Sequence, residues 1–247
     1  MPTTDVLVVA TVTFLFAGWV KGVVGMGLPT VGMGTLALVM PPVQAAALLV
    51  VPSFVTNVWQ YFAGPSTSSI TKRLAVMMVL VCAGTAIGIR FLTSGSKWPS
   101  VALGSVLAVY SLVGLFLPKL SVPRRHEPWL SSVVGGITGV LTGATGVFVV
   151  PAVPYLSALG LTKDELIQAL GLSFTVSTVA LAIALGASGS FSRELVLASL
   201  AAVVPALAGM LIGQAVRNRP DPIAFRRWFF IAMLLVGAYM TIKGLAH

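Results

Sequence analysis

Charged residues are scarce in this chain of 247 residues: they make up 9% of it, whereas 57% is hydrophobic. A water-soluble domain carries about 25% charged residues, so this composition cannot supply a water-exposed surface. Apolar runs long enough to cross a bilayer recur along the whole length. The sequence therefore predicts an all-α, multi-pass protein of the cell inner (plasma) membrane, surrounded by the lipid bilayer.

Groups that usually carry catalysis or bind metal are also few. The six acidic residues all fall at segment ends or in loops, and both histidines, His126 and His247, lie outside the apolar runs. The single cysteine, Cys82, cannot form an internal disulfide. We therefore expect no metal, no cofactor and no enzyme activity. A serine–lysine pair that uses Lys21 is the one arrangement of an intramembrane hydrolase that stays conceivable.

The net charge of +9 comes from basic residues in short loops, as in "TKR" (71–73), "KLSVPRRHE" (119–127) and "RNRPDPIAFRR" (217–227). Such a distribution is typical of charge that sets the orientation of a membrane protein. We expect no nucleic-acid partner.

The chain reads as two copies of one unit. Gly18 and Gly22 match Gly135 and Gly139, and "SF" at 53–54 matches "SF" at 173–174. Further on, "GTAIG" (84–88) resembles "GMLIG" (209–213). These matches predict a first transmembrane repeat (1–118), a linker (119–128) and a second transmembrane repeat (129–247), as in duplicated transporters.

Each half has the same predicted order of segments. An apolar helix (6–24; 129–142) runs into a Gly-rich break, and a short apolar piece (28–40; 147–159) follows. A long helix with a polar patch (43–63; 165–186) and two ordinary spans (73–93 and 98–117; 194–216 and 225–245) complete the unit.

Loop charge discriminates between parallel and inverted halves. If the segment around the break crosses once, the halves are parallel and the loop Lys and Arg divide evenly between the two sides. If it is a pair of crossings or a re-entrant hairpin, the halves are inverted. One side then holds Lys72, Arg73, Lys119, Arg124, Arg125, Lys163, Arg217, Arg219, Arg226 and Arg227, and the other holds Arg90, Lys97, Arg193 and Lys243. This asymmetry favours inversion, with both termini outside.

The Gly-rich breaks predict an anion site. Gly22, Gly25 and Gly27 precede Pro29, and the counterpart in the second half runs through Gly139, Gly143, Thr145 and Gly146 toward Pro151. Non-helical backbone is tolerated at membrane depth only inside protein or beside a wet cavity. A helix that restarts after such a break presents free N–H groups and partial positive charge. The alternative is close helix packing by GxxxG patterns, which we favour for Gly84/Gly88 and Gly209/Gly213.

Lys21 lies within the first apolar run. A lysine in a span costs roughly 2.5–3.5 kcal/mol on insertion scales, so it indicates a functional site, although snorkelling to the interface is an equally weighted alternative. No carboxylate of the sequence is placed to neutralise it at depth. An anionic substrate could do so.

Hydroxyl and amide side chains gather on the long helix of each half: Ser53, Thr56, Asn57 and Gln60 in the first, and Gln168, Ser173, Thr175, Ser177 and Thr178 in the second. Those of the first half share one helical face. Such donors suit an oxyanion that must be held and released. They could equally hold helices together, each hydrogen bond contributing about 0.6 kcal/mol.

The paired glycine clusters, each followed by a proline, together with the "SF" patch and the GxxxG spans, resemble the TauE/SafE family of sulfite and organosulfonate exporters. The likeness covers nearly the whole chain, although "GMGLPTVG" (25–32) lacks the family's run of adjacent glycines and its proline comes early. The resemblance implies a permease for small sulfur-containing anions. Its motif positions correspond to Gly22, Gly25, Gly27, Gly139, Gly143, Gly146 and Pro151.

These observations together predict a secondary transporter that exports a small sulfur oxyanion by alternating access. We expect the anion to be bound by one set of residues from both halves: Lys21, Gly22, Gly25, Gly27, Ser53, Thr56, Asn57, Gly143, Thr145, Gly146, Ser173, Thr175 and Ser177. A passive anion channel and, less favoured, an intramembrane enzyme are the alternatives. The sequence leaves the oligomeric state open, a homodimer included.

Overall fold

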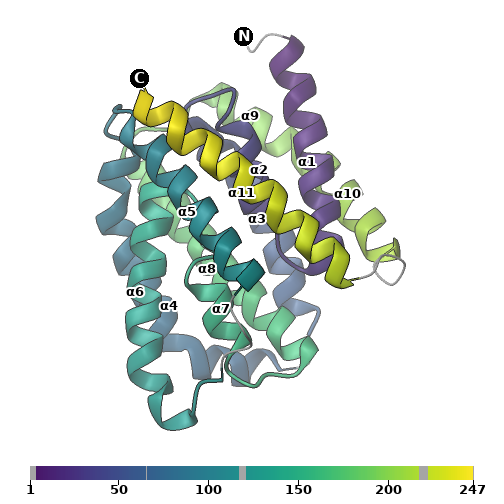
Figure 1. Ribbon diagram of the computed structural model, residues 1–247, viewed down its shortest axis with the longest axis vertical. Helices are drawn as coiled ribbons and strands as arrows, with labels where there is room; N and C mark the ends of the chain where they lie inside the picture. The colour runs from purple at the N-terminus through teal and green to yellow at the C-terminus, as the bar shows by residue number, and fades with distance from the viewer. Residues whose placement is uncertain (1–3, 65, 117–120, 217–221, 247) are drawn as a thin grey trace.

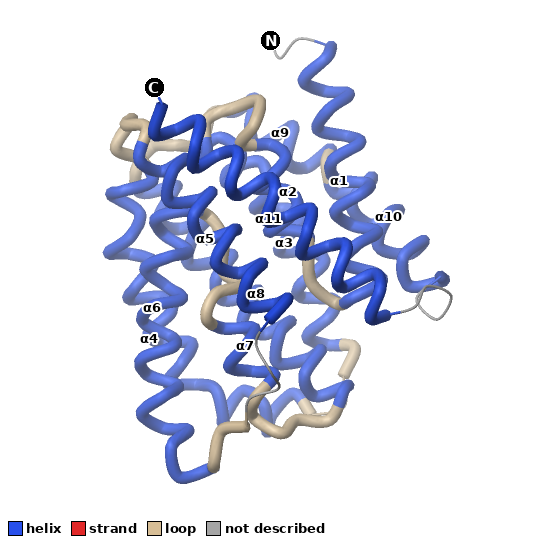
Figure 2. The backbone as a smooth tube through the Cα atoms, in the orientation of Figure 1, coloured by secondary structure: helices blue, strands red, loops and turns tan. Residues whose placement is uncertain are grey.

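The computed structural model describes residues 4–64, 66–116, 121–216 and 222–246, and within these ranges every regular element is a helix (Figure 2). Six of the helices are long and apolar enough to cross a membrane. The fold class predicted from composition is therefore confirmed. The linker 119–128 lies partly outside the described residues.

The first half of the chain forms α1 (Thr4–Val24), α2 (Leu28–Leu36), α3 (Pro42–Phe62), α4 (Thr67–Leu92) and α5 (Trp98–Phe116). The second half forms a 3-10 turn (Arg124–His126), α6 (Glu127–Thr145), α7 (Ala152–Ser157), α8 (Lys163–Ala187), α9 (Arg193–Ala201), α10 (Val203–Val216) and α11 (Pro222–Ala246). Most of the predicted long helices agree with these bounds to within a few residues.

The predicted span 194–216 agrees with the candidate membrane span Arg193–Val216. It is divided into α9 and α10 at Ala202, because Pro205 has no N–H to bond the carbonyl of Ala201. Two shorter predicted segments need correction, and proline explains both. The predicted piece 28–40 is helical only to Leu36, since the chain turns before Pro41 and Pro42. The predicted piece 147–159 is helical only in α7, because the residues before Pro151 are non-helical.

Glycines bring two pairs of parallel helices into backbone contact. A Cβ on Gly84 or Gly88 of α4 would collide with the backbone of α6, and one on Gly209 or Gly213 of α10 would collide with the backbone of α1. The packing interpretation of these GxxxG patterns is confirmed. Figure 1 shows the two pairs, α4 with α6 and α1 with α10, on opposite flanks of the bundle.

Two antiparallel pairs fill the space between these flanks. In the α3–α8 pair, Tyr61 contacts Gly171 and Asn57 contacts Thr178; in the α5–α11 pair, Gly104 contacts Gly237. Half of the α3 span and 61% of the α8 span are buried, against 22% of the α11 span. The polar patches of α3 and α8 therefore lie in the centre of the molecule, and α11 lies on its surface.

Candidate functional site

The first break lies between α1 and α2. Gly25 and Gly27 have φ angles of 78° and 132°, a backbone region that favours glycine, and these angles turn the chain out of α1. Gly27 is the N-cap of α2, and its carbonyl accepts from Val31 N at 2.7 Å. The first-turn amides of Leu28 and Thr30 therefore have no carbonyl of the preceding turn to bond, and they point out of the start of α2.

The second break follows α6. Gly146 ends the helix in the left-handed conformation, with φ 73°. The Thr145 hydroxyl donates to Leu141 O at 2.7 Å and accepts from Val147 N at 3.2 Å, so it bonds backbone groups on both sides of the helix end. The next helix, α7, begins only at Ala152. This break therefore presents buried non-helical backbone, and a helix start comes several residues later.

The two breaks meet at one small cavity. Pro29 of the first and Gly146 of the second both line it, with the hydroxyl side chains of Ser53 and Thr178 and the apolar residues Ala46, Leu49, Val50, Phe148 and Leu181. Its volume is about 10 Å³. That is close to the minimum space for one water molecule, so the cavity is too small for any larger guest in this conformation.

Lys21 lies inside the protein. Its side chain is 2% exposed, so it does not snorkel to the interface. The ammonium donates to Asn57 Oδ1 and to Thr56 Oγ1, the latter at 3.2 Å. Among the side chains that the structure describes, the one ion pair joins Arg73 to Glu127, and Lys21 has no carboxylate partner. Its charge is buried and uncompensated.

A chain of hydrogen bonds connects Lys21 to the cavity wall. Asn57 accepts from Lys21 and donates from Nδ2 to Thr178 Oγ1 at 3.3 Å, and Thr178 lines the cavity. Gln60 of α3 also connects the first break to α8, because its Nε2 donates hydrogen bonds to Gly25 O and to Ile167 O, each at 2.9 Å. Groups from both halves of the chain thus hold one polar site.

Several buried hydroxyls in the described region have no hydrogen-bond partner: Thr30, Ser53, Thr138, Ser173 and Ser177. Ser53 lines the cavity, and Ser173 and Ser177 are one turn apart on the same face of α8. An unpaired buried hydroxyl costs roughly 1–3 kcal/mol, so each of them indicates a place where a ligand or water can supply the missing hydrogen bond. Thr175 differs, since it is half-buried and donates to Gly171 O at 2.7 Å.

The structure places Gly22 and Gly143 at contacts between helices, although both were predicted to bind the anion. Both lie within helices before the breaks, where a Cβ on Gly22 would meet the backbone of α10 and one on Gly143 would meet that of α4. Close helix packing accounts for both. Pro29, Phe148 and Thr178 line the cavity without having been singled out as ligand-binding. Thr178 belongs to the predicted polar patch and Pro29 to the first break. Their positions in the sequence therefore already placed these two residues near the predicted site.

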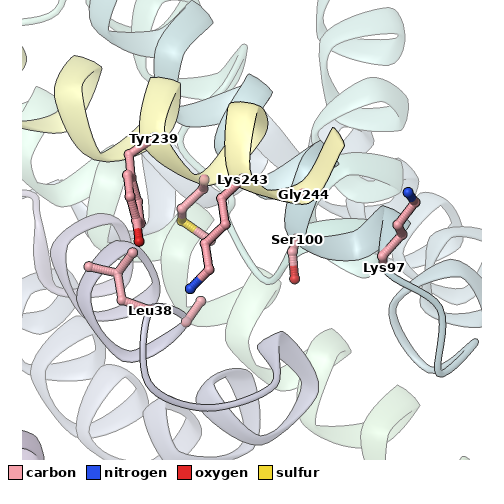
Figure 3. A pocket seen from close by; sticks show the side chains of 8 residues that line it. Leu38, Lys97, Ser100, Tyr239, Lys243 and Gly244 are labelled. Atoms are coloured by element: carbon pink, nitrogen blue, oxygen red, sulfur yellow. The ribbon is translucent and has the colours of Figure 1, made fainter. Parts of the chain in front are cut away.

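Among the described residues, no cluster of metal-ligating side chains and no larger pocket coincides with the site. No group of three or more His, Cys, Asp or Glu side chains in the described ranges could hold a metal ion. A pocket of about 270 Å³ lies elsewhere, and it is lined by none of the predicted site residues (Figure 3).

A bundle of apolar helices with a buried, polar and positively charged centre defines a multi-pass membrane protein of the transporter class. The chain belongs to the TauE/SafE sulfite exporter family, whose sequence model matches residues 10–240. The resemblance expected from the glycine motifs is thereby confirmed. No curated protein and no solved structure matches the chain.

Proposed function

We propose that this protein is a secondary carrier that moves a small sulfur oxyanion, such as sulfite or a sulfonate, out of the cell. The observation that carries the proposal is Lys21, a lysine that is 2% exposed and lacks a carboxylate partner among the described side chains. A buried charge of this kind is costly unless an opposite charge accompanies it. An anionic substrate would supply that charge, and the family supplies the chemical class.

The anion would bind between the two breaks. Lys21 supplies the positive charge, and the first-turn amides of α2 supply N–H donors and the positive end of a helix dipole. Ser53, Ser173 and Ser177 have hydroxyls with no protein partner, so they can turn toward an oxyanion. Thr145 and Thr56 would act on the anion indirectly. Thr145 accepts a hydrogen bond from the backbone at the end of α6, and Thr56 accepts one from Lys21.

Alternating access would open the cavity to each side in turn. Inverted repeats make this possible, and the helix pairing supports them. If α3 and α8, and likewise α5 and α11, are equivalent helices, their antiparallel packing requires that the two halves have opposite orientation. The exchange of flanking helices, α1 with α10 and α6 with α4, fits the same two-fold relation.

Export needs no coupling ion. An anion that leaves an inside-negative cell gains about 2.3 kcal/mol per charge per 100 mV. The acidic residues of the sequence lie at segment ends or in loops, so the apolar spans contain no carboxylate for a proton relay. We therefore expect flux that depends on voltage.

Flux into proteoliposomes tests the proposal. With sulfite and the fully ionised methanesulfonate as substrates, the wild type should give saturable, voltage-dependent flux. Lys21→Met should lower it roughly tenfold or more, because it removes charge-assisted hydrogen bonds while keeping side-chain length. Lys72→Met, which removes an exposed lysine, is the control.

Flux of methanesulfonate that is strictly proton-driven and independent of voltage would contradict electrogenic export. Unchanged flux in a folded Lys21→Met variant would show that Lys21 does not bind the anion. Counterflow discriminates a carrier from a channel, because only a carrier exchanges labelled for unlabelled substrate against a gradient.

A further inference from the structure

A second pocket opens at the end of the bundle that carries the C terminus, between the end of α2 and the helices α5 and α11 (Figure 3). Its volume is about 270 Å³. Small-molecule pockets usually begin at about 300 Å³, so this one suits a small polar head group. It shares no residue with the proposed transport site.

Two lysines make the pocket positive. Lys243 comes from α11 and Lys97 from the residue before α5, and both side chains are exposed. Their amines lie near aromatic rings, Lys243 at 5.7 Å from the Tyr239 ring centre and Lys97 at 5.9 Å from that of Trp98. None of the described residues that line the pocket is acidic. An anion is the ligand that this charge favours.

The side chains are arranged around an open space. In Figure 3, Lys243 and Tyr239 reach from α11 toward Leu38, and Ser100 lies between them and Lys97 at the opposite rim. A head group that enters from the membrane side would meet an ammonium and two hydroxyls.

The surroundings of the pocket are apolar. Leu38 at its edge is 39% exposed, and Ile242 and Leu245, which flank Lys243 and Gly244 on α11, are 68% and 57% exposed. Trp98 and Tyr239 are about half exposed, as aromatic residues are at the boundary between lipid and water. A free anion would use only the polar part of this surface, whereas a lipid would use both parts.

We propose that this pocket binds the phosphate head group of an anionic phospholipid, whose acyl chains lie along the exposed apolar face of α11. Basic pockets between membrane helices bind such head groups. The inference does not depend on which anion the carrier moves. A free oxyanion has the same charge chemistry and is the second source that the experiment distinguishes.

The test uses delipidated full-length protein in neutral detergent, with bound lipid counted by native mass spectrometry. Short-chain phosphatidylglycerol should bind more tightly than phosphatidylcholine of the same chain length. Lys243→Gln and Lys97→Gln should each weaken the phosphatidylglycerol affinity about fivefold, the contribution of one surface lysine. Lys163→Gln, which removes an exposed lysine outside the pocket, should leave it unchanged.

Equal affinity for the two lipids, or wild-type affinity in the double Lys97→Gln/Lys243→Gln variant, would overturn the proposal. A second arm titrates inorganic phosphate and methanesulfonate and follows thermal unfolding. Stabilisation by these ions that Lys243→Gln abolishes, without selective lipid binding, would assign the pocket to a free anion. Lys21→Met should keep the lipid affinity, so failure of the transport site and failure of this pocket give different results.

Discussion

At the scale of single residues, Gly146 joins a special backbone conformation to a crowded position. Its φ of 73° is rarely adopted by residues with a side chain, and an added Cβ would lie 3.0 Å from Met33 Cε and 3.2 Å from Ala46 Cβ. The backbone conformation therefore favours glycine, and an added Cβ would also displace its neighbours slightly. A Cβ here would therefore meet α2 and α3, and Gly146 also lines the cavity.

Gly146→Ala should destabilise the protein by about 1–2 kcal/mol from the left-handed conformation alone. Gly136→Ala in the same helix is the matched control, because its Cβ meets no atom within 4 Å. That substitution should be neutral or stabilising by up to about 1 kcal/mol, since alanine favours helix. Thermal unfolding in detergent measures both. Equal melting temperatures for the two variants would contradict the assigned conformation.

Residue types alone did not reveal the role of every polar side chain. Lys21 and Asn57 stood out because both lie inside apolar runs, and the structure joins them by a hydrogen bond that the sequence did not predict. Gln168, from the same polar patch as Ser173, instead donates to Tyr61 O at 2.9 Å and Gly64 O at 3.1 Å, at the end of α3. Hydrogen bonds between distant segments decide such roles, and no local pattern encodes them.

At the scale of elements, α3 contains a proline whose missing hydrogen bond is replaced by another helix. Pro52 cannot donate to Leu48 O, and the Ser199 hydroxyl of α9 donates to that carbonyl at 2.8 Å. Ser199 also accepts from Val51 N at 3.2 Å. The interruption in α3 comes one residue before Ser53, which lines the cavity. Here α3 is held by a side chain from the second half.

Ser199→Ala should cost about 1–3 kcal/mol, because it leaves Leu48 O buried without a donor. The cost should shrink in a Pro52→Ala background, because the alanine introduced there has an N–H that can bond Leu48 O within the helix. A double-mutant cycle of thermal stabilities in detergent measures this coupling. Strictly additive effects would show that Ser199 does not replace the missing bond.

At the scale of the whole molecule, basic residues divide between the two ends of the bundle. Figure 1 shows the C terminus and the starts of α5 and α9 at one end, and the starts of α4 and α6 at the other. Arg73 and Glu127 pair at that second end, which also holds Arg124 and Arg125. Part of the predicted charge asymmetry rests on Lys119, Arg217 and Arg219, which lie outside the described residues.

Labelling of single cysteines tests the orientation. In a Cys82→Ala background, Ser68→Cys and Ser96→Cys place thiols at exposed positions near opposite ends of α4. If the richer basic end faces the cytoplasm, a membrane-impermeant maleimide should label Ser96→Cys in intact cells and Ser68→Cys only after permeabilisation. The reverse pattern would mean the opposite orientation, and labelling of both in intact cells would mean that α4 does not cross.

Sequence by itself determined the membrane class, most helix bounds and both breaks, because the bilayer sets span length and glycine sets local backbone freedom. It placed Lys21 within an apolar run but left open whether the side chain is buried, which the structure decided. Only the tertiary structure decided that Gly22 and Gly143 face neighbouring helices, that Thr178 meets Asn57, and that Ser199 serves α3. These are contacts between residues far apart in the chain, and their geometry depends on how whole helices pack. The size of the cavity follows from that packing as well.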